Sequence, residues 1–134
     1  RFVPSVAPLK EKYRISDRDG YRTHPISGER QFHAGLDMAA VYAATVHAAA
    51  SGTVTFAGET PGYGKTVVVT HRFGFQTRYA HLTLIYTRKG AKVEKGDVIG
   101  FVGSTGISTG NHLHYEVIKN QKRINPLNFI YGTK

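Results

Sequence analysis

Short strand-like segments separated by glycine-containing turns dominate the sequence from residue 52 onward. In GTVTFAG (52–58), Val54 and Phe56 alternate with Thr53 and Thr55, as the two faces of a strand require. The other strand-like segments are KTVVVTH (65–71), FQTRYAHL (75–82), DVIGFVGSTG (97–106) and HLHYEVI (112–118). This spacing of strand and turn signals predicts an all-β domain, a compact two-sheet sandwich or barrel-like structure. We also expect PLNFI (126–130) to form a short terminal turn.

The segment MAAVYAATVHAAA (38–50) carries two conflicting signals. Alanine is the best helix former, so propensity alone predicts a helix. Thr45 and Val46 interrupt the alanines, however, and Gly52 begins a strand directly afterwards. We therefore favour extended structure here, with a helix as the alternative.

The length and composition predict one domain with its own core. A chain of 134 residues, of which 40% are hydrophobic, can bury such a core without disulfides. The absence of Cys excludes a disulfide scaffold, a thiolate metal site and a cysteine nucleophile. We expect residues 1–20, which include Pro4 and Pro8, to be an extended N-terminal lead-in. Residues 21–134 are expected to form a single domain.

The N-terminal sequence and the charge bear on location and partners. No apolar run reaches the ~18–20 residues that span a bilayer, and RFVPSVAPLK lacks the apolar region of a signal peptide. The chain also lacks an initiator Met, so we expect a piece of a longer protein, with any membrane anchor in a missing flank. The net charge of +9 favours an anionic partner. The basic residues are spread out and no RNP-like run or zinc-finger spacing occurs, so nucleic acid is not expected.

Histidines and an aspartate recur at spacings typical of a metal site. His33 and Asp37 are four residues apart in QFHAGLDM, and His112 and His114 are two apart in HLHYE. Positions i, i+2 and i+4 of a strand share one face, so each set would project together. Gly35 would leave room near the backbone for a metal or a neighbouring chain. A helix also brings i and i+4 together, but a glycine inside it costs about 1 kcal/mol.

Two imidazoles and a carboxylate can hold a divalent metal. Three protein ligands leave a fourth position open, which is typical of catalytic zinc, and the metal lowers the pKa of bound water toward ~7. The same donors form the facial triad of non-haem iron oxygenases, so the spacing alone leaves both metals open. Additional histidines, such as His81 in RYAHL, favour hydrolysis because they can transfer protons and stabilise an oxyanion.

Other conspicuous residues are interpreted as structural. GFVGSTGISTGNH (100–112) lacks the lysine of a phosphate-binding loop, and we expect tight turns that lead into the HLH strand. His24 lies in a turn-like context, and we assign no role to His47 or His71. Tyr79 has the same strand parity as His81, but we expect it to pack in the core.

Several motifs together resemble those of the lysostaphin/LytM-type zinc metallopeptidases. In order and spacing they are HAGLD, AAASGTVTFAG, GYGKTVVVTH, TRYAHL, VEKGDVIGFVGSTGISTGNHLHYEV and INPLNF. The match runs from about Tyr21 to Ile130. The resemblance implies a small all-β two-sheet fold with a groove above a zinc ion. It also implies hydrolysis of peptide bonds in bacterial peptidoglycan stems or cross-bridges.

The resemblance also implies roles for individual residues. The zinc ligands would be His33, Asp37 and His114, and the catalytic pair would be His81 and His112. One of the pair would act as general base and the other would stabilise the tetrahedral intermediate, in an order that the sequence leaves open.

Three further positions bear on the resemblance. Glu116 shares strand parity with His114, so it is either a hydrogen-bond partner of that ligand or a strand contact. AATV (43–46) replaces the Gly-Thr-Pro-Val turn that is frequent in the family, and Asp19 stands before Gly20 where the family often has Phe. The local loop and the substrate preference therefore stay open.

The sequence YRTHPISGERQFHAGLDMAA is more similar to enzymes that cut D-Ala–diaminopimelate cross-links than to those that cut glycine-rich bridges. We therefore expect a D,D-endopeptidase for cell-wall remodelling, located in the periplasm or outside the cell. The alternative is a non-catalytic LytM-like module that binds or activates another wall hydrolase. The presence of all the metal and catalytic positions favours the enzyme, and a related protein subunit is a further candidate partner.

Overall fold

The computed structural model describes residues 4, 7–10, 12–17, 20–23, 30–33, 35–106 and 110–126, with the backbone path alone at 16–17, 20–23 and 30–33. These residues form strands β1 to β12, and every strand pair is antiparallel. The all-β prediction is confirmed.

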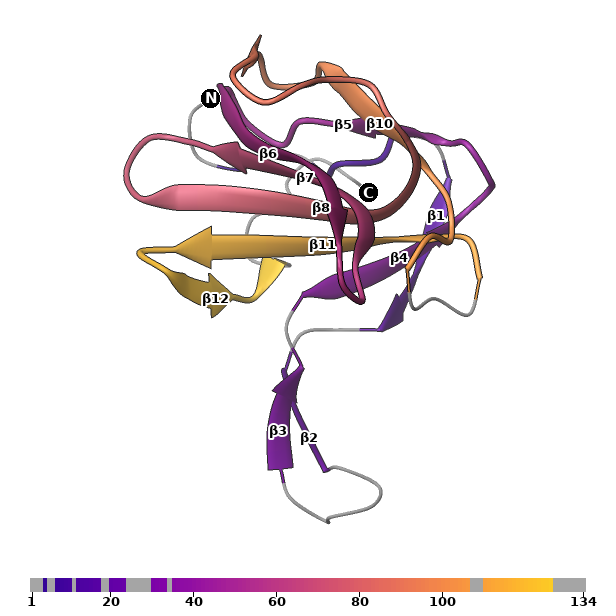
Figure 1. The fold of residues 1–134 in the computed structure, drawn as a ribbon. Helices are drawn as coiled ribbons and strands as arrows, with labels where there is room; N and C mark the ends of the chain where they lie inside the picture. Colours follow the sequence, from indigo (N-terminus) through magenta and orange to yellow (C-terminus); the bar gives the residue numbers. More distant parts are fainter. Residues whose placement is uncertain are drawn as a thin grey trace.

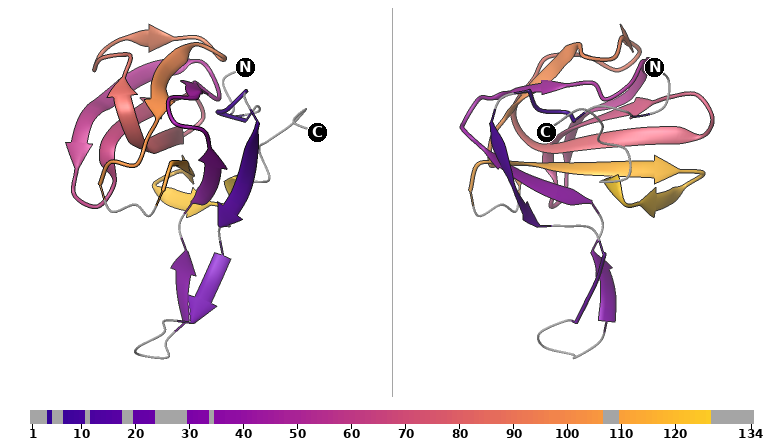
Figure 2. Two further views of the ribbon diagram at one scale, coloured as in Figure 1. Left: turned by 90° about the vertical axis from the view of Figure 1, so that its right-hand side faces the viewer. Right: turned by 180° about the vertical axis from the view of Figure 1, so that it is seen from behind.

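Most strands belong to one ten-stranded sheet. Its main path runs through β1 (Tyr13–Asp17), β4 (Leu36–Ala40), β11 (His112–Lys119), β8 (Phe75–Ile85), β7 (Gly64–Thr70), β6 (Gly52–Thr60) and β9 (Lys92–Val93). Off this path, β10 (Val98–Val102) pairs with β8 and with β5 (Thr45–His47), while β12 (Lys122–Ile124) pairs with β11. A separate two-stranded sheet, β2 (Gly20–Thr23) and β3 (Arg30–His33), projects away from the large sheet (Figures 1 and 2).

The core draws on both the main path and the β5–β10 pair. Leu36, Tyr79 and Tyr115 from the main path and Val46 and Ile99 from the β5–β10 side are all fully buried in one cluster. On β11, the core cluster includes Leu113, Tyr115 and Val117. The even-numbered histidines of β11 consequently project from the other face of the sheet.

Strand structure occurs both in the described part of the chain before β4 and in the alanine-rich segment. Tyr13–Asp17, within the expected lead-in, pairs with β4, and Ala7 and Leu9 are buried in the core cluster. Residues 38–50 contain the end of β4, a turn and β5, so they are not a helix. The expected turn at 126–130 lies outside the described residues after position 126. The part of the chain that the structure describes has no helix long and apolar enough to cross a membrane.

Candidate functional site

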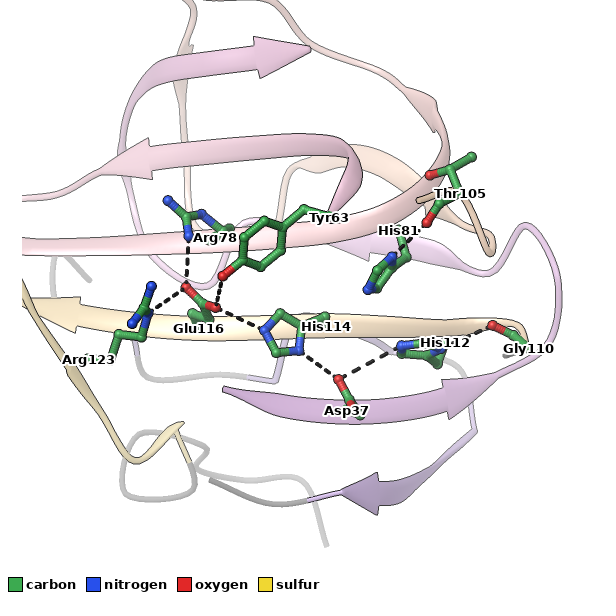
Figure 3. A network of polar contacts seen from close by, with 10 residues as sticks. All are labelled: Asp37, Tyr63, Arg78, His81, Thr105, Gly110, His112, His114, Glu116 and Arg123. Atoms are coloured by element: carbon green, nitrogen blue, oxygen red, sulfur yellow. Dashed lines mark hydrogen bonds and ion pairs between the residues drawn. The ribbon is translucent and has the colours of Figure 1, made fainter. Parts of the chain in front are cut away.

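The pairing of β4 with β11 brings an aspartate against two histidines. Asp37 is the register partner of His114, and Asp37 Oδ1 lies 2.6 Å from His114 Nδ1. The same oxygen lies 3.8 Å from His112 Nε2 (Figure 3). Three residues of the predicted site therefore meet on the face of the sheet that points away from the core.

The link between His33 and Asp37 differs from the sequence expectation of one continuous strand. His33 ends β3, which belongs to the small sheet, and β4 begins at Leu36. Gly35, between them, has φ +92°, which is outside the range of a strand. The chain therefore turns between the two residues, and strand alternation does not relate them. The side chain of His33 lies outside what the structure describes, and the described side chains alone form no cluster of three metal-binding groups.

Gly35 permits a close approach of the backbone to His114. A Cβ at this position would lie 2.6 Å from His114 Cε1 and 2.7 Å from His114 Nε2, and 2.9 Å from Glu116 Cγ. These distances are shorter than real Cβ contacts, and the positive φ also favours glycine. The room expected at Gly35 is thus filled by a neighbouring side chain, the imidazole of His114.

His81 reaches the site through a bulge in β8. Tyr79 and Leu82 on β8 pair with Val67 and Lys65 on β7, so β8 carries one extra residue between these pairs. His81 itself has φ +63°, an uncommon conformation for a residue other than glycine. The expectation that Tyr79 packs in the core is confirmed, but the shared parity of Tyr79 and His81 does not hold. The bulge turns the His81 ring to the opposite face, 4.8 Å from the ring of His112.

The two candidate catalytic histidines are oriented in the same way. His81 Nδ1 lies 2.6 Å from the carbonyl oxygen of Thr105, and His112 Nδ1 lies 3.0 Å from that of Gly110. A carbonyl only accepts, so Nδ1 carries the proton in each ring and Nε2 is the basic nitrogen. Burial, the largest influence, lowers the pKa of His81, so this imidazole is neutral at neutral pH and able to accept a proton.

Thr105 anchors His81 to the neighbouring strands. Its hydroxyl donates to the carbonyl of Leu82 at 2.6 Å and accepts from the backbone N–H of Lys65 at 3.0 Å. The glycine-rich segment thus supplies a connection that contacts β7 and β8 through Thr105. Of the segment 100–112 that was expected to form tight turns, residues 100–102 belong to β10 and residues 103–106 form an irregular connection with a bend at Gly106, whereas residues 107–109 lie outside the described part.

A buried carboxylate lies on the other side of His114. Glu116 Oε2 is 2.9 Å from His114 Nε2 and accepts a hydrogen bond from the Tyr63 hydroxyl, also at 2.9 Å. Glu116 Oε1 accepts from Arg78 at 3.1 Å and lies 3.5 Å from Arg123 Nε (Figure 3). Strand parity indicated Glu116 as a candidate partner. The sequence does not indicate the other three partners of Glu116, because they come from distant parts of the chain: Tyr63, Arg78 and Arg123.

The two carboxylates beside His114 determine its charge in the absence of a metal. Burial lowers the pKa of His114, but the hydrogen bonds to Asp37 and Glu116 outweigh it and raise this pKa to about 9. Burial likewise raises the pKa of Glu116, but the His114 and Arg78 contacts outweigh it and lower this pKa. Glu116 is therefore a carboxylate, which can only accept hydrogen bonds.

Two other histidines have structural partners, consistent with the absence of an assigned role. His47 contacts the Thr45 hydroxyl and the Gly96 carbonyl, both at 2.8 Å. His71 contacts the Ser51 carbonyl and the Thr77 hydroxyl, also at 2.8 Å. His24 lies outside the described residues.

The donors at the centre of the site suit a zinc ion. An imidazole nitrogen and a carboxylate oxygen point toward each other at 2.6 Å, and both are zinc ligands in proteins. Gly35 provides the space that holds the imidazole there. Asp37 and His114 would hold the metal, together with His33 as the resemblance implies.

Comparisons with known proteins place the chain among peptidases. Residues 31–126 match the model of Peptidase family M23. The chain is 48% identical over 120 residues to "DD-carboxypeptidase/endopeptidase Mpg" of Neisseria meningitidis and 38% identical over 121 residues to "Peptidoglycan DD-endopeptidase ShyA" of Vibrio cholerae. Each alignment covers 90% of this chain but 28% of the relative. A zinc-containing peptidase from Vibrio cholerae superposes with a TM-score of 0.86 at 32% identity, covering 92% of this chain and 39% of the other.

Proposed function

Because the chain belongs to peptidase family M23, we propose that it is a zinc-dependent endopeptidase that hydrolyses peptide cross-links of bacterial peptidoglycan. The proposed scissile bond joins D-Ala to diaminopimelate. The names of the two relatives, a DD-carboxypeptidase/endopeptidase and a peptidoglycan DD-endopeptidase, support this choice. Since the chain spans 28% of their length, the activity of the whole protein is part of the proposal.

One arrangement carries the proposal: a metal-ligand pair and two basic imidazoles share one face of the sheet. Asp37 and His114 supply the ligand pair at 2.6 Å. The His81 ring lies 4.8 Å from the His112 ring and 6.1 Å from that of His114. A bound zinc ion supplies Lewis acidity and lowers the pKa of water.

Two protein side chains then transfer the proton and stabilise the developing negative charge. His81 and His112 each have Nδ1–H bonded to a backbone carbonyl, so each presents Nε2 as a base. One of them accepts the proton of the attacking water and delivers it to the departing amine. The other, when it holds a proton at Nε2, donates a hydrogen bond to the oxyanion.

The proposed substrate also gives a location and a partner. Peptidoglycan lies outside the cytoplasmic membrane, so we place the protein in the periplasm or at the cell exterior. The net charge of +9 suits an anionic wall polymer.

The test is digestion of purified diaminopimelate-type peptidoglycan by the zinc-loaded chain, with mass spectrometry of the released muropeptides. We expect cross-linked dimers to be cut at D-Ala–diaminopimelate, a loss of cutting with a chelator, and recovery with zinc. A chain that binds zinc but releases nothing would instead favour the non-catalytic regulatory module. Activity that needs iron and a keto acid would indicate an oxygenase.

A further inference from the structure

We propose that Glu116 is a positioning residue: it accepts the Nε2 proton of His114 and so keeps Nδ1 as the nitrogen that faces Asp37. The inference rests on the proposed function, in which Asp37 and His114 hold the metal. In this arrangement, Glu116 determines which nitrogen of His114 can act as a ligand.

The geometry links the two residues through their strand. Glu116 and His114 are two positions apart on β11 and therefore project from the same face. Glu116 Oε2 lies 2.9 Å from His114 Nε2, and the Glu116 side chain is fully buried. Both oxygens of Glu116 accept hydrogen bonds, one from Tyr63 and the other from Arg78, so the proton of the contact with His114 belongs to Nε2.

Three side chains hold the Glu116 carboxylate in place. Tyr63 donates its hydroxyl proton to the same oxygen that contacts His114, and Arg78 donates to the other oxygen at 3.1 Å. Arg123 Nε lies 3.5 Å from that second oxygen. The guanidinium carbon of Arg78 lies 4.8 Å from the centroid of the Tyr63 ring, so these two supports also contact each other. A buried carboxylate needs such partners, because desolvation of an unpaired charge is costly.

Close packing against Gly35 also restrains the imidazole ring of His114. His114 Cε1 and Nε2 pack where a Cβ of residue 35 would lie, so the imidazole has little space to rotate. Without a metal, Nδ1 also carries a proton, which it donates to Asp37. A metal beside Asp37 would require the loss of that proton, and the tautomer that keeps it and loses the Nε2 proton could not bind a metal there. Glu116 excludes that tautomer because Nε2 would then present a lone pair to a carboxylate.

The experiment measures zinc affinity by competition with a chelator for the wild-type chain, Glu116→Gln and Glu59→Gln. Glu59 is exposed on β6, so its variant loses the same charge at the surface of the protein. We expect Glu116→Gln to bind zinc about 10–100-fold more weakly, because the amide cannot accept from His114 without turning its NH2 group toward the guanidinium of Arg78. We expect Glu59→Gln to bind as the wild type does. Equal affinity in folded Glu116→Gln and wild type would overturn the role of Glu116.

A spectroscopic readout distinguishes positioning from general support of the fold. Long-range ¹H–¹⁵N correlation spectra of the zinc-loaded wild type should place the His114 proton on Nε2, with its resonance displaced in Glu116→Gln. A proton on Nδ1 in the wild type would overturn the proposal without any variant. If Glu116→Gln does not fold, Glu116→Asp keeps the charge for Arg78 and withdraws the carboxylate from His114; it should also weaken zinc binding. A wild-type chain that binds no zinc would overturn the proposed function instead.

Discussion

Asp37 and His114, 77 residues apart in the chain, are register partners on β4 and β11, and their side chains meet at 2.6 Å. Their contact joins the motif HAGLD to the motif HLH. The position of the site thus depends on the pairing of two strands that are distant in sequence.

Asp37→Asn should lose zinc binding. The substitution keeps the shape of the side chain but removes the only anionic ligand of the proposed set, so the dication would be left with neutral imidazoles. The measurement is zinc content per chain after gel filtration, beside the rate on peptidoglycan. Full activity with normal zinc content would refute the assignment of Asp37.

Alanine substitutions of the two HLH histidines should have different effects on zinc binding. His114→Ala should lose both zinc and hydrolysis, whereas His112→Ala should keep zinc while the rate falls by roughly 10²–10⁴-fold, the usual contribution of a positioned acid–base group. His81→Ala should behave as His112→Ala does. Zinc lost from His112→Ala but retained by His114→Ala would reverse the two roles.

Gly35→Ala should weaken zinc binding, and Gly90→Ala is its matched control. Both glycines have φ +92°, so both variants carry a backbone strain of about 1–2 kcal/mol or more. Only the Gly35 variant directs its Cβ into His114, since a Cβ at Gly90 would meet nothing within 4 Å. Zinc titration should therefore show weaker binding for Gly35→Ala alone. Equal zinc affinity in both variants would show that the close packing of His114 against Gly35 does not affect zinc binding.

The contribution of His71 to the stability of the fold should fall on acidification. This side chain is buried between Ser51 and Thr77, and burial, the largest influence, lowers its pKa from 6.5. The unfolded chain then binds the proton more readily, so the contribution of neutral His71 is complete above about pH 6.5 and is lost as the pH falls below it. Urea unfolding at about pH 7.5 and about pH 5.5 measures the change.

The control for this pH effect is His71→Gln, which cannot titrate. The variant should be less stable than the wild type at about pH 7.5, because it cannot reproduce both hydrogen bonds of the imidazole. The difference between the two proteins should shrink at about pH 5.5. A difference that grows on acidification would mean that folding raises the pKa of His71 instead of lowering it.

Removal of the metal should leave the fold intact. Leu36, Tyr79 and Tyr115 are fully buried in the core without help from the site, so burial of apolar surface supports the structure. Far-UV circular dichroism should be nearly unchanged after chelation while hydrolysis stops. Unfolding on chelation would show that the metal is structural as well.

Local alternation is sufficient to predict the main strands and the shared face of the residues on β11. The segments that became β6, β7, β8, β10 and β11 were recognised because β-branched and alternating residues lie between turn residues. The same alternation placed His112, His114 and Glu116 on one face of β11. Each of these predictions concerns residues only a few positions apart, where the strand period applies directly.

Tertiary structure decided the relations that cross between segments. Alternation gives Tyr79 and His81 the same face, and only the extra residue of β8, with φ +63° at His81, separates the buried Tyr79 from an imidazole that lies beside His112. Similarly, strand pairing set Arg78 opposite Glu116 and Asp37 opposite His114. A bulge and a register depend on the fit between neighbouring strands, so the residues of one strand do not determine them.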